Sequence, residues 1–346
     1  MSAAARRLPD RAGTDVIGLP ARDCLVVAIA TPITGELAPD VPLLLARSRA
    51  LLENGCDGIA LFGTTGEGAH FAPRERMATL EALVAAGLPP ARLVVATGAL
   101  SLLDVVELSR HAVGQGVAAC LLMPPCFYRG GLTEDGAFRW YAAAIDRIGS
   151  DRLRLLLYHF PDISGVPITP GTVRRLVERY GAQIAGIKDS GGDLDVTESL
   201  LRRFSELAVF TGTETHVPAA MASGARGTIC GLANVIPHLM RRMLQAPSLP
   251  ERRRFVPLVR AVDAILSRGP FIAAVKAVVA AATGEPGWRR MVPPAGPLSM
   301  VDEGRLLEDF GRFEESLPLD WREAMQRRGT AELAPTGAEA RAGGSR

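Results

Sequence analysis

Eight short apolar runs, each followed by a longer segment of helical periodicity, constrain the fold of this chain more than any other feature. The runs are rich in Val, Ile, Leu and Ala and lie at residues 25–30, 58–62, 93–97, 118–123, 153–158, 184–188, 207–211 and 227–230. From the second run to the eighth, successive runs start about 28 residues apart, which is close to the length of one βαβ unit. The runs are continuously apolar, as is typical of parallel strands buried on both faces.

The segments between the runs carry helix-start signals. Proline in a first helical turn marks a start at Pro73 and again at Pro170, and Thr133 followed by two acidic residues marks another. Eight strands alternating with helices predict an α/β fold, specifically a (β/α)8 TIM barrel, with an open doubly wound sheet as the alternative. No Gly-x-Gly-x-x-Gly sequence follows the first run, which weighs against that alternative and against a dinucleotide site.

The pattern divides the chain into four parts. Residues 22–246 are predicted to form the barrel, and residues 247–328 a C-terminal helical appendage with helices at 251–267, 270–283, 302–315 and 320–326. Residues 1–21 and the tail 329–346 have no apolar period and are predicted to be disordered.

Composition excludes several classes of protein. The formal net charge of +2 provides no basic field for binding nucleic acid. The most apolar long stretch, residues 271–282, is shorter than the roughly 20 residues of a membrane span and contains Lys276, so it predicts a core helix whose lysine snorkels to the surface. The charged N-terminus does not resemble a signal peptide. The five scattered cysteines indicate a reducing cytoplasm, and neither they nor the histidines have metal-ligand spacing.

Lysine is rare in this chain. Only Lys188 and Lys276 are lysines among the 39 basic residues, and Lys188 ends the sixth run, where the active site of a barrel lies. An amine can lose its proton and attack a carbonyl to form a Schiff base, whereas a guanidinium cannot. Lowering a lysine pKa from about 10.4 to near 7 takes roughly 4 to 5 kcal/mol, which desolvation at a barrel mouth can supply. Lys188 is therefore the predicted nucleophile.

Other candidates follow neighbouring runs. Tyr158 ends the fifth run and could shuttle protons to a Schiff base, or could be a core aromatic whose hydroxyl bonds to the backbone. The loop Gly63-Thr-Thr-Gly-Glu-Gly offers hydroxyls and backbone N–H groups suited to a carboxylate, although such a loop is often only a turn. Glu67 and Asp189 are expected to fix loops rather than transfer protons, and Cys126 is a reactive thiol or an inert buried one.

Four segments, GTTGE at 63–67, YHFP at 158–161, GIKDSGGD at 186–193 and GARGTICGLAN at 224–234, together resemble the dihydrodipicolinate synthase and N-acetylneuraminate lyase family of class I aldolase barrels. The likeness extends from about residue 27 to about residue 297. It implies that Lys188 forms an imine with pyruvate or another 2-oxo acid, that Tyr158 relays protons with Thr64 as its hydrogen-bonded partner, and that Thr65 and the Gly63 loop hold the acid's carboxylate.

The resemblance also implies roles for other positions. Gly227 and Ile229, at the end of the eighth run, are expected to border the pyruvate, and His159 either contacts the substrate or bonds to the backbone. Phe127 stands where the family has a relay tyrosine that is lent across a tight dimer interface, and Tyr128, one place on, is the candidate to replace it.

The expected function follows from this resemblance. It implies a cytoplasmic lyase or aldolase without metal or other cofactor, acting on a small-molecule 2-oxo acid and an aldehyde, in a dimer or homotetramer. Segments 126–130 and 188–193 are similar to those of 4-hydroxy-2-oxoglutarate aldolases, which favours 4-hydroxy-2-oxo acids. The alternatives are 4-hydroxy-tetrahydrodipicolinate synthase, against which Ile163 weighs because it replaces the synthases' carboxylate-binding arginine, and a non-catalytic 2-oxo acid-binding protein.

Overall fold

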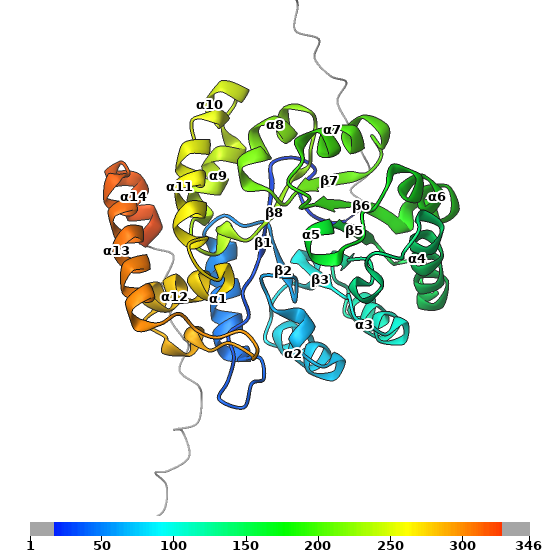
Figure 1. Cartoon of the computed structure of the whole chain (residues 1–346), viewed down its shortest axis with the longest axis horizontal. Coiled ribbons are helices and arrows are strands. Elements are labelled where there is room, and N and C mark those ends of the chain that lie inside the picture. The colour runs from blue at the N-terminus through cyan, green and yellow to red at the C-terminus, as the bar shows by residue number, and fades with distance from the viewer. Residues whose placement is uncertain (1–16, 327–346) are drawn as a thin grey trace, which may run out of the picture.

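The computed structural model describes residues 17–326 and contains a closed parallel barrel in which β8 pairs with β1 (Figure 1). The strands are β1 (Cys24–Ala28), β2 (Gly58–Leu61), β3 (Leu93–Ala96), β4 (Ala119–Leu122), β5 (Leu155–His159), β6 (Ile184–Asp189), β7 (Ala208–Thr211) and β8 (Gly227–Cys230). The predicted TIM barrel is confirmed, and the doubly wound alternative is wrong because the sheet closes on itself.

Helices surround the strands. They are α1 (Val41–Glu53), α2 (Pro73–Ala85), α3 (Leu102–Gly114), α4 (Glu134–Ile148), the short α5 (Pro161–Ser164), α6 (Pro170–Tyr180), α7 (Leu194–Arg203), α8 (Val217–Ala222) and α9 (Pro237–Gln245). The predicted starts are confirmed: Pro73 opens α2, and the side chains of Thr133 and Thr169 cap α4 and α6 by accepting hydrogen bonds from backbone N–H groups in the first turn.

The barrel interior is a packed core. Alternate residues of the strands point inward, and Ile17 and Leu19 join their cluster, each 2% exposed. The Arg226 guanidinium holds this N-terminal segment by donating to the backbone carbonyls of Leu19 and Pro20. The predicted disorder is therefore wrong for residues 17–20, which are held in place because two apolar side chains gain burial against the strands. Residues 1–16 and the predicted tail 329–346 lie outside the described residues.

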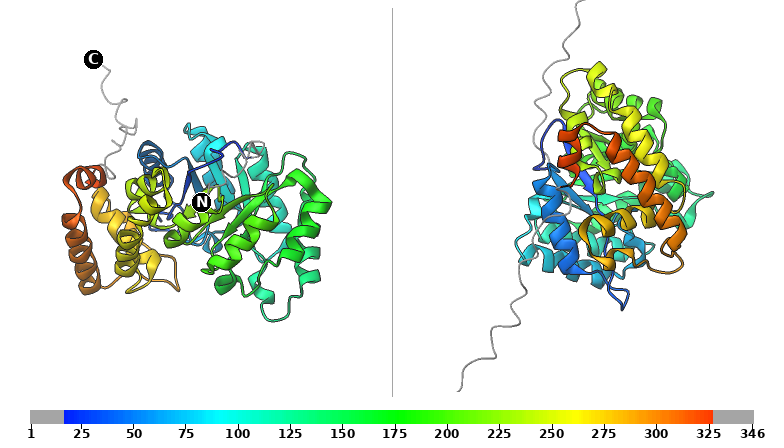
Figure 2. Two further views of the ribbon diagram at one scale, coloured as in Figure 1. Left: turned by 90° about the horizontal axis from the view of Figure 1, so that it is seen from above. Right: turned by 90° about the vertical axis from the view of Figure 1, so that its left-hand side faces the viewer.

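The C-terminal region is helical, as predicted. Its helices are α10 (Leu249–Arg253), α11 (Val256–Leu266), α12 (Phe271–Thr283), α13 (Met300–Ser316) and α14 (Leu319–Gln326). α13 packs on α11 and α12, on the side away from the strands (Figures 1 and 2). The single helix predicted over 251–267 is wrong: the chain breaks between α10 and α11, where Pro257 opens a new first turn.

α12 is the core helix that the sequence predicts, with residues 273–280 buried. The predicted snorkelling of Lys276 is wrong, because this side chain is 0% exposed and is ion-paired inside the protein. Within residues 17–326, no single helix is long and apolar enough to cross a membrane, and one sharply bent pair, α10–α11 with α12, passes on length and composition alone.

Candidate active site

Lys188 and Tyr158 lie side by side near the C-terminal ends of β6 and β5. The two residues are paired in register, and the Lys188 Nζ lies 4.2 Å from the centre of the Tyr158 ring. Both side chains are buried, at 5% and 3% exposed. An amine is thus held against the face of a phenol at the end of the barrel where the βα loops converge, which is where active sites of this fold lie.

Thr64 reaches the same phenol from the loop after β2, because its Oγ1 lies 3.2 Å from the Tyr158 Oη. The Tyr158 hydroxyl therefore contacts a side chain, and not the backbone as expected for a tyrosine that serves only the core. Gly63, beside Thr64, faces open space, since a Cβ there would meet no atom within 4 Å. Thr65 lies on the other side, where its Oγ1 packs against Gly231 after β8.

The loop after β2 is tightly folded around these threonines. Phe62 and Glu67 have left-handed backbone conformations, with φ of 57° and 53°. A Cβ on Gly66 would lie 2.8 Å from the Ile29 carbonyl oxygen, and one on Gly68 would lie 1.9 Å from the Phe62 carbonyl oxygen. Glycine is required at both positions because neighbouring backbone occupies the space of a side chain.

His159 and Asp189 follow Tyr158 and Lys188 on their strands. The His159 Nδ1 accepts a hydrogen bond of 3.0 Å from the Ile168 N–H. Of the two expectations for this residue, the bond to backbone is therefore present at Nδ1. Burial lowers the pKa of His159, and the nearby Asp189 carboxylate opposes that effect. Asp189 accepts hydrogen bonds from the Gly191 N–H and the Thr197 hydroxyl, contacts that fix the loop after β6.

The two site residues predicted on β8 have different surroundings. Gly227 begins the strand and pairs with Cys24 at the start of β1 and with Phe210 of β7, the residue that also pairs with Lys188. A Cβ there would lie 1.9 Å from the Cys24 carbonyl oxygen, so strand packing requires this glycine, and its place beside the pyruvate stays a prediction. Ile229 is fully buried in the interior cluster that also contains Tyr158.

Two residues after β7 belong to the site and were missed by the sequence reasoning. A Cβ on Gly212 would lie 1.9 Å from the Ser190 Oγ and 3.2 Å from the Lys188 Cε, so this glycine leaves room for both side chains. The Glu214 Oε1 accepts hydrogen bonds from the Gly231 and Leu232 N–H groups. Burial raises the pKa of Glu214 above its ordinary value, and the Leu232 N–H group and the Lys188 charge only partly oppose that rise. The available signal was the Gly-x-Glu sequence directly after the seventh run.

The loop after β4 is exposed. Phe127 and Tyr128 form an edge-to-face pair with ring centres 5.4 Å apart and are 75% and 57% exposed, so in one chain Tyr128 is not packed into the Lys188 cluster. Cys126 is also exposed, which rules out the reading of a buried inert thiol. The other four cysteines are buried, and burial raises the pKa of Cys24, Cys56 and Cys120 to about 12.

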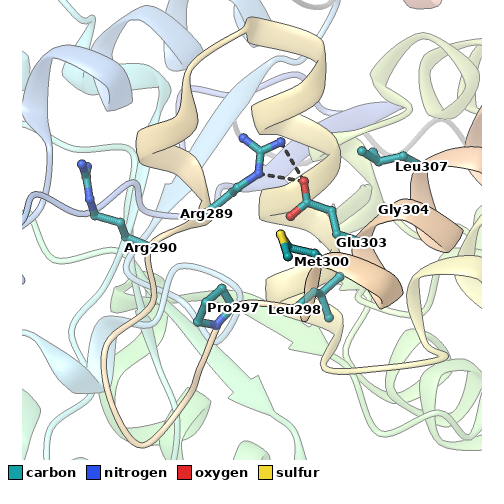
Figure 3. A pocket seen from close by; sticks show the side chains of 8 residues that line it. All are labelled: Arg289, Arg290, Pro297, Leu298, Met300, Glu303, Gly304 and Leu307. Atoms are coloured by element: carbon teal, nitrogen blue, oxygen red, sulfur yellow. Dashed lines mark hydrogen bonds and ion pairs between the residues drawn. The ribbon is translucent and has the colours of Figure 1, made fainter.

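A cavity of about 520 Å³ lies elsewhere, between α13 and the segment that precedes it (Figure 3). Its lining residues are Arg289, Arg290, Pro297, Leu298, Met300, Glu303, Gly304 and Leu307. None of the predicted site residues borders it. Across residues 17–326, no three His, Cys, Asp or Glu side chains gather in a way that could hold a metal ion.

The chain is thus an eight-stranded barrel in which a buried tyrosine and a buried lysine lie side by side at the ends of β5 and β6. Comparison with known proteins identifies the family of such barrels to which it belongs. The family model of the dihydrodipicolinate synthetase family matches residues 23–300. The chain belongs to this family.

Relatives support the family assignment. The chain is 36% identical over 223 residues to an uncharacterized DapA-like lyase of Chloroflexus aurantiacus, covering 64% of this chain and 74% of that protein. It is 31% identical to a 4-hydroxy-tetrahydrodipicolinate synthase of Methylococcus capsulatus, covering 69% and 80%. The crystal structure of dihydrodipicolinate synthase from Agrobacterium tumefaciens superposes with a TM-score of 0.79 at 31% identity, covering 84% and 99%. The family consists of lyases and synthases, and the chain is a lyase of this family.

Proposed function

We propose that this protein is a class I lyase that makes or breaks a carbon–carbon bond at the methyl carbon of pyruvate held as an imine on Lys188. The observation that carries the proposal is the cluster of Lys188, Tyr158 and Thr64, in which an amine, a phenol and a hydroxyl from three different strand ends lie in contact. An amine beside a proton donor is the arrangement that imine chemistry needs.

The proposed reaction begins with attack of the Lys188 amine on the C2 carbonyl of the 2-oxo acid. The oxygen of the resulting carbinolamine takes up a proton and leaves as water, and Tyr158, hydrogen-bonded to Thr64, is placed to deliver that proton. In cleavage, the protonated imine accepts the electron pair of the broken C3–C4 bond and becomes an enamine, while the C4 hydroxyl loses its proton and becomes the aldehyde. Protonation of the enamine at C3 and hydrolysis release pyruvate and the free amine.

The carboxylate of the 2-oxo acid is proposed to bind at the loop after β2. Thr65 brings a hydroxyl and a backbone N–H, and Gly63 faces open space, so a planar acid group can approach the backbone closely. Ile229 is proposed to border the methyl group from below, and His159 to contact the substrate through its Nε2.

The proposed substrates are 4-hydroxy-2-oxo acids. Ile163 in α5 is partly exposed and apolar where a carboxylate-binding arginine would serve a synthase. The alternative is 4-hydroxy-tetrahydrodipicolinate synthesis, which the name of the Methylococcus capsulatus relative favours. A coupled assay with pyruvate and aspartate semialdehyde separates the two reactions: turnover as fast as with the best 4-hydroxy-2-oxo acid would overturn our preference.

The decisive experiment is borohydride reduction in the presence of pyruvate, followed by peptide mass spectrometry. We expect the mass of the reduced pyruvyl adduct on Lys188 and none in Lys188→Ala. Because Lys276 is the other lysine of the chain, an adduct there, or none in the wild type, would contradict the proposal. The second outcome would instead favour a non-catalytic binding protein.

We also propose that the protein functions in the cytoplasm as a dimer or tetramer. Four large apolar side chains that follow β3 and β4 support self-association, since Leu100, Leu103, Phe127 and Tyr128 are each more than half exposed. The five free thiols fit a reducing compartment.

A further inference from the structure

A buried ion pair joins the C-terminal helices to the loop that carries Thr64 and Thr65. The Lys276 Nζ, on α12, lies 2.5 Å from the Glu67 Oε1, and the two residues are 0% and 4% exposed. The same ammonium donates a hydrogen bond of 2.8 Å to the Arg290 carbonyl. One of the two lysines in the chain thus forms an ion pair with a residue 209 positions away in the sequence.

Stability alone does not account for this pair. Removing two charges from water costs several kcal/mol for each ion, and an apolar pair of similar volume is often as stable or more so. Lys276 interrupts a buried run of Ala and Val in α12, where an apolar side chain would continue the core. An ion pair differs from an apolar contact in being directional, because it is satisfied only when donor and acceptor keep one geometry.

The ion pair maintains the geometry of the loop after β2, which carries Thr64 and Thr65. Glu67 holds a left-handed backbone conformation, and its N–H donates to the Thr64 carbonyl at 3.1 Å. The Thr31 hydroxyl, in the segment after β1, donates to the Gly66 carbonyl at 2.7 Å and fixes the loop from that side. A displacement of Glu67 would therefore move Thr64, whose hydroxyl contacts the Tyr158 phenol.

The C-terminal end of the link is itself anchored. Arg290 directly follows a short 3-10 helix, Pro286–Arg289, and its guanidinium donates to the Ile33 carbonyl at 3.2 Å. Figure 3 shows the neighbouring Arg289 turned toward α13, where it pairs with Glu303 at 2.7 Å. The carbonyl that receives Lys276 therefore belongs to a segment held by both the barrel and α13.

We propose that Glu67 and Lys276 are positioning residues for the imine chemistry: α12 holds the loop after β2 so that Thr64 stays on Tyr158 and Thr65 stays where the carboxylate binds. The C-terminal region is then part of the active-site framework and not only a cover for one side of the barrel. The inference rests on the proposed function, because its readouts are imine formation and pyruvate affinity.

The test compares Lys276→Met, Glu67→Asp and the double variant Glu67→Gln/Lys276→Met with the wild type. The double variant leaves no uncompensated buried charge, and Glu67→Asp keeps both charges while shortening the reach by one methylene. We measure the thermal midpoint, the rate of imine formation by borohydride trapping, and the pyruvate KM. We expect the double variant to regain most of the thermal midpoint lost in Lys276→Met, while both it and Glu67→Asp form the imine about 10- to 100-fold more slowly, as for a reacting group displaced by a fraction of an ångström.

Arg241→Met is the matched control, because Arg241 pairs with Asp57 at 2.5 Å at the opposite end of the barrel. It is expected to lower the thermal midpoint and leave the imine rate unchanged. A wild-type rate and KM in Glu67→Asp or in the double variant would overturn the inference and reduce the pair to a structural one. Absence of imine in the wild type would instead contradict the proposed function, so the two failures are distinguishable.

Discussion

The Tyr158 hydroxyl is the group whose removal isolates proton transfer from packing. Tyr158→Phe keeps the ring that lies over the Lys188 amine and against Phe160, with ring centres 5.9 Å apart, and loses only the contact with Thr64. We expect imine formation with pyruvate to slow by about 100-fold or more, because a positioned acid–base group contributes that much. Quenched borohydride trapping gives the rate, and calorimetry should show a nearly unchanged thermal midpoint. A wild-type rate would remove Tyr158 from the relay.

His159 makes stability depend on pH. Because burial lowers its folded-state pKa below the ordinary 6.5, the folded protein binds fewer protons than the unfolded chain as the pH falls below about 6.5. The contribution of His159 is therefore intact above that pH and lost in acid. In His159→Asn, the thermal midpoint should fall by a few degrees less than in the wild type between pH 7 and pH 5. Parallel curves would contradict the assignment, and His70→Asn, at an exposed site, is the control.

Among single residues, the sequence predicts those whose position follows from the rule that active sites of a barrel lie at the C-terminal ends of its strands. Lys188 and Tyr158 end apolar runs, so their place at the barrel mouth needed no knowledge of side-chain contacts. Glu214 and Gly212 could not be placed the same way, because their relation to Lys188 depends on how the loop after β7 turns back toward β8. The burial of Lys276 was missed for a similar reason: its partner Glu67 is distant in sequence.

At the scale of elements, buried parallel strands are easy to recognise, and the ends of strands are not. Each predicted run overlaps an observed strand and differs from it by at most two residues at either end, since continuous apolar sequence bounded by helical periods has few other uses. Gly227 lies within a correctly predicted strand, but its neighbours on the adjacent strands could not be predicted. The sequence does not show the stagger of the barrel, and that stagger places the glycine at the start of β8 beside Cys24.

Gly227→Ala tests whether this glycine serves packing. The added methyl would meet the Cys24 backbone, and backbone of a closed barrel cannot give way as a flexible side chain does. We expect a loss of about 1–3 kcal/mol or more in the free energy of unfolding, measured by denaturant titration. Gly35→Ala, where a Cβ meets no atom within 4 Å, should change stability little. A stable Gly227→Ala protein with a raised pyruvate KM would instead support the substrate-contact role.

At the scale of the whole molecule, the C-terminal helices occupy one side of the barrel and the exposed aromatic pair projects from another part of it. α13 and α14 lie outside α11 and α12 (Figure 2), whereas Phe127 and Tyr128 follow β4, and Leu100 and Leu103 follow the adjacent β3. In the proposed dimer, these exposed apolar side chains would contact a second chain, which would then lie beside the loops that follow β3 and β4. Self-association and activity are therefore expected to change together.

Leu103→Glu/Phe127→Glu places two carboxylates on that surface. We expect sedimentation velocity to show a shift toward monomer, because charge in an apolar interface pays an uncompensated desolvation cost. Turnover should fall with the fraction of monomer, while Lys188 remains accessible to pyruvate and borohydride. Met300→Glu alters a side chain on α13 that is 92% exposed, and it should leave the sedimentation coefficient unchanged. The reverse result, with dissociation by Met300→Glu alone, would place the interface on the C-terminal helices, and then Tyr128 could not act across it.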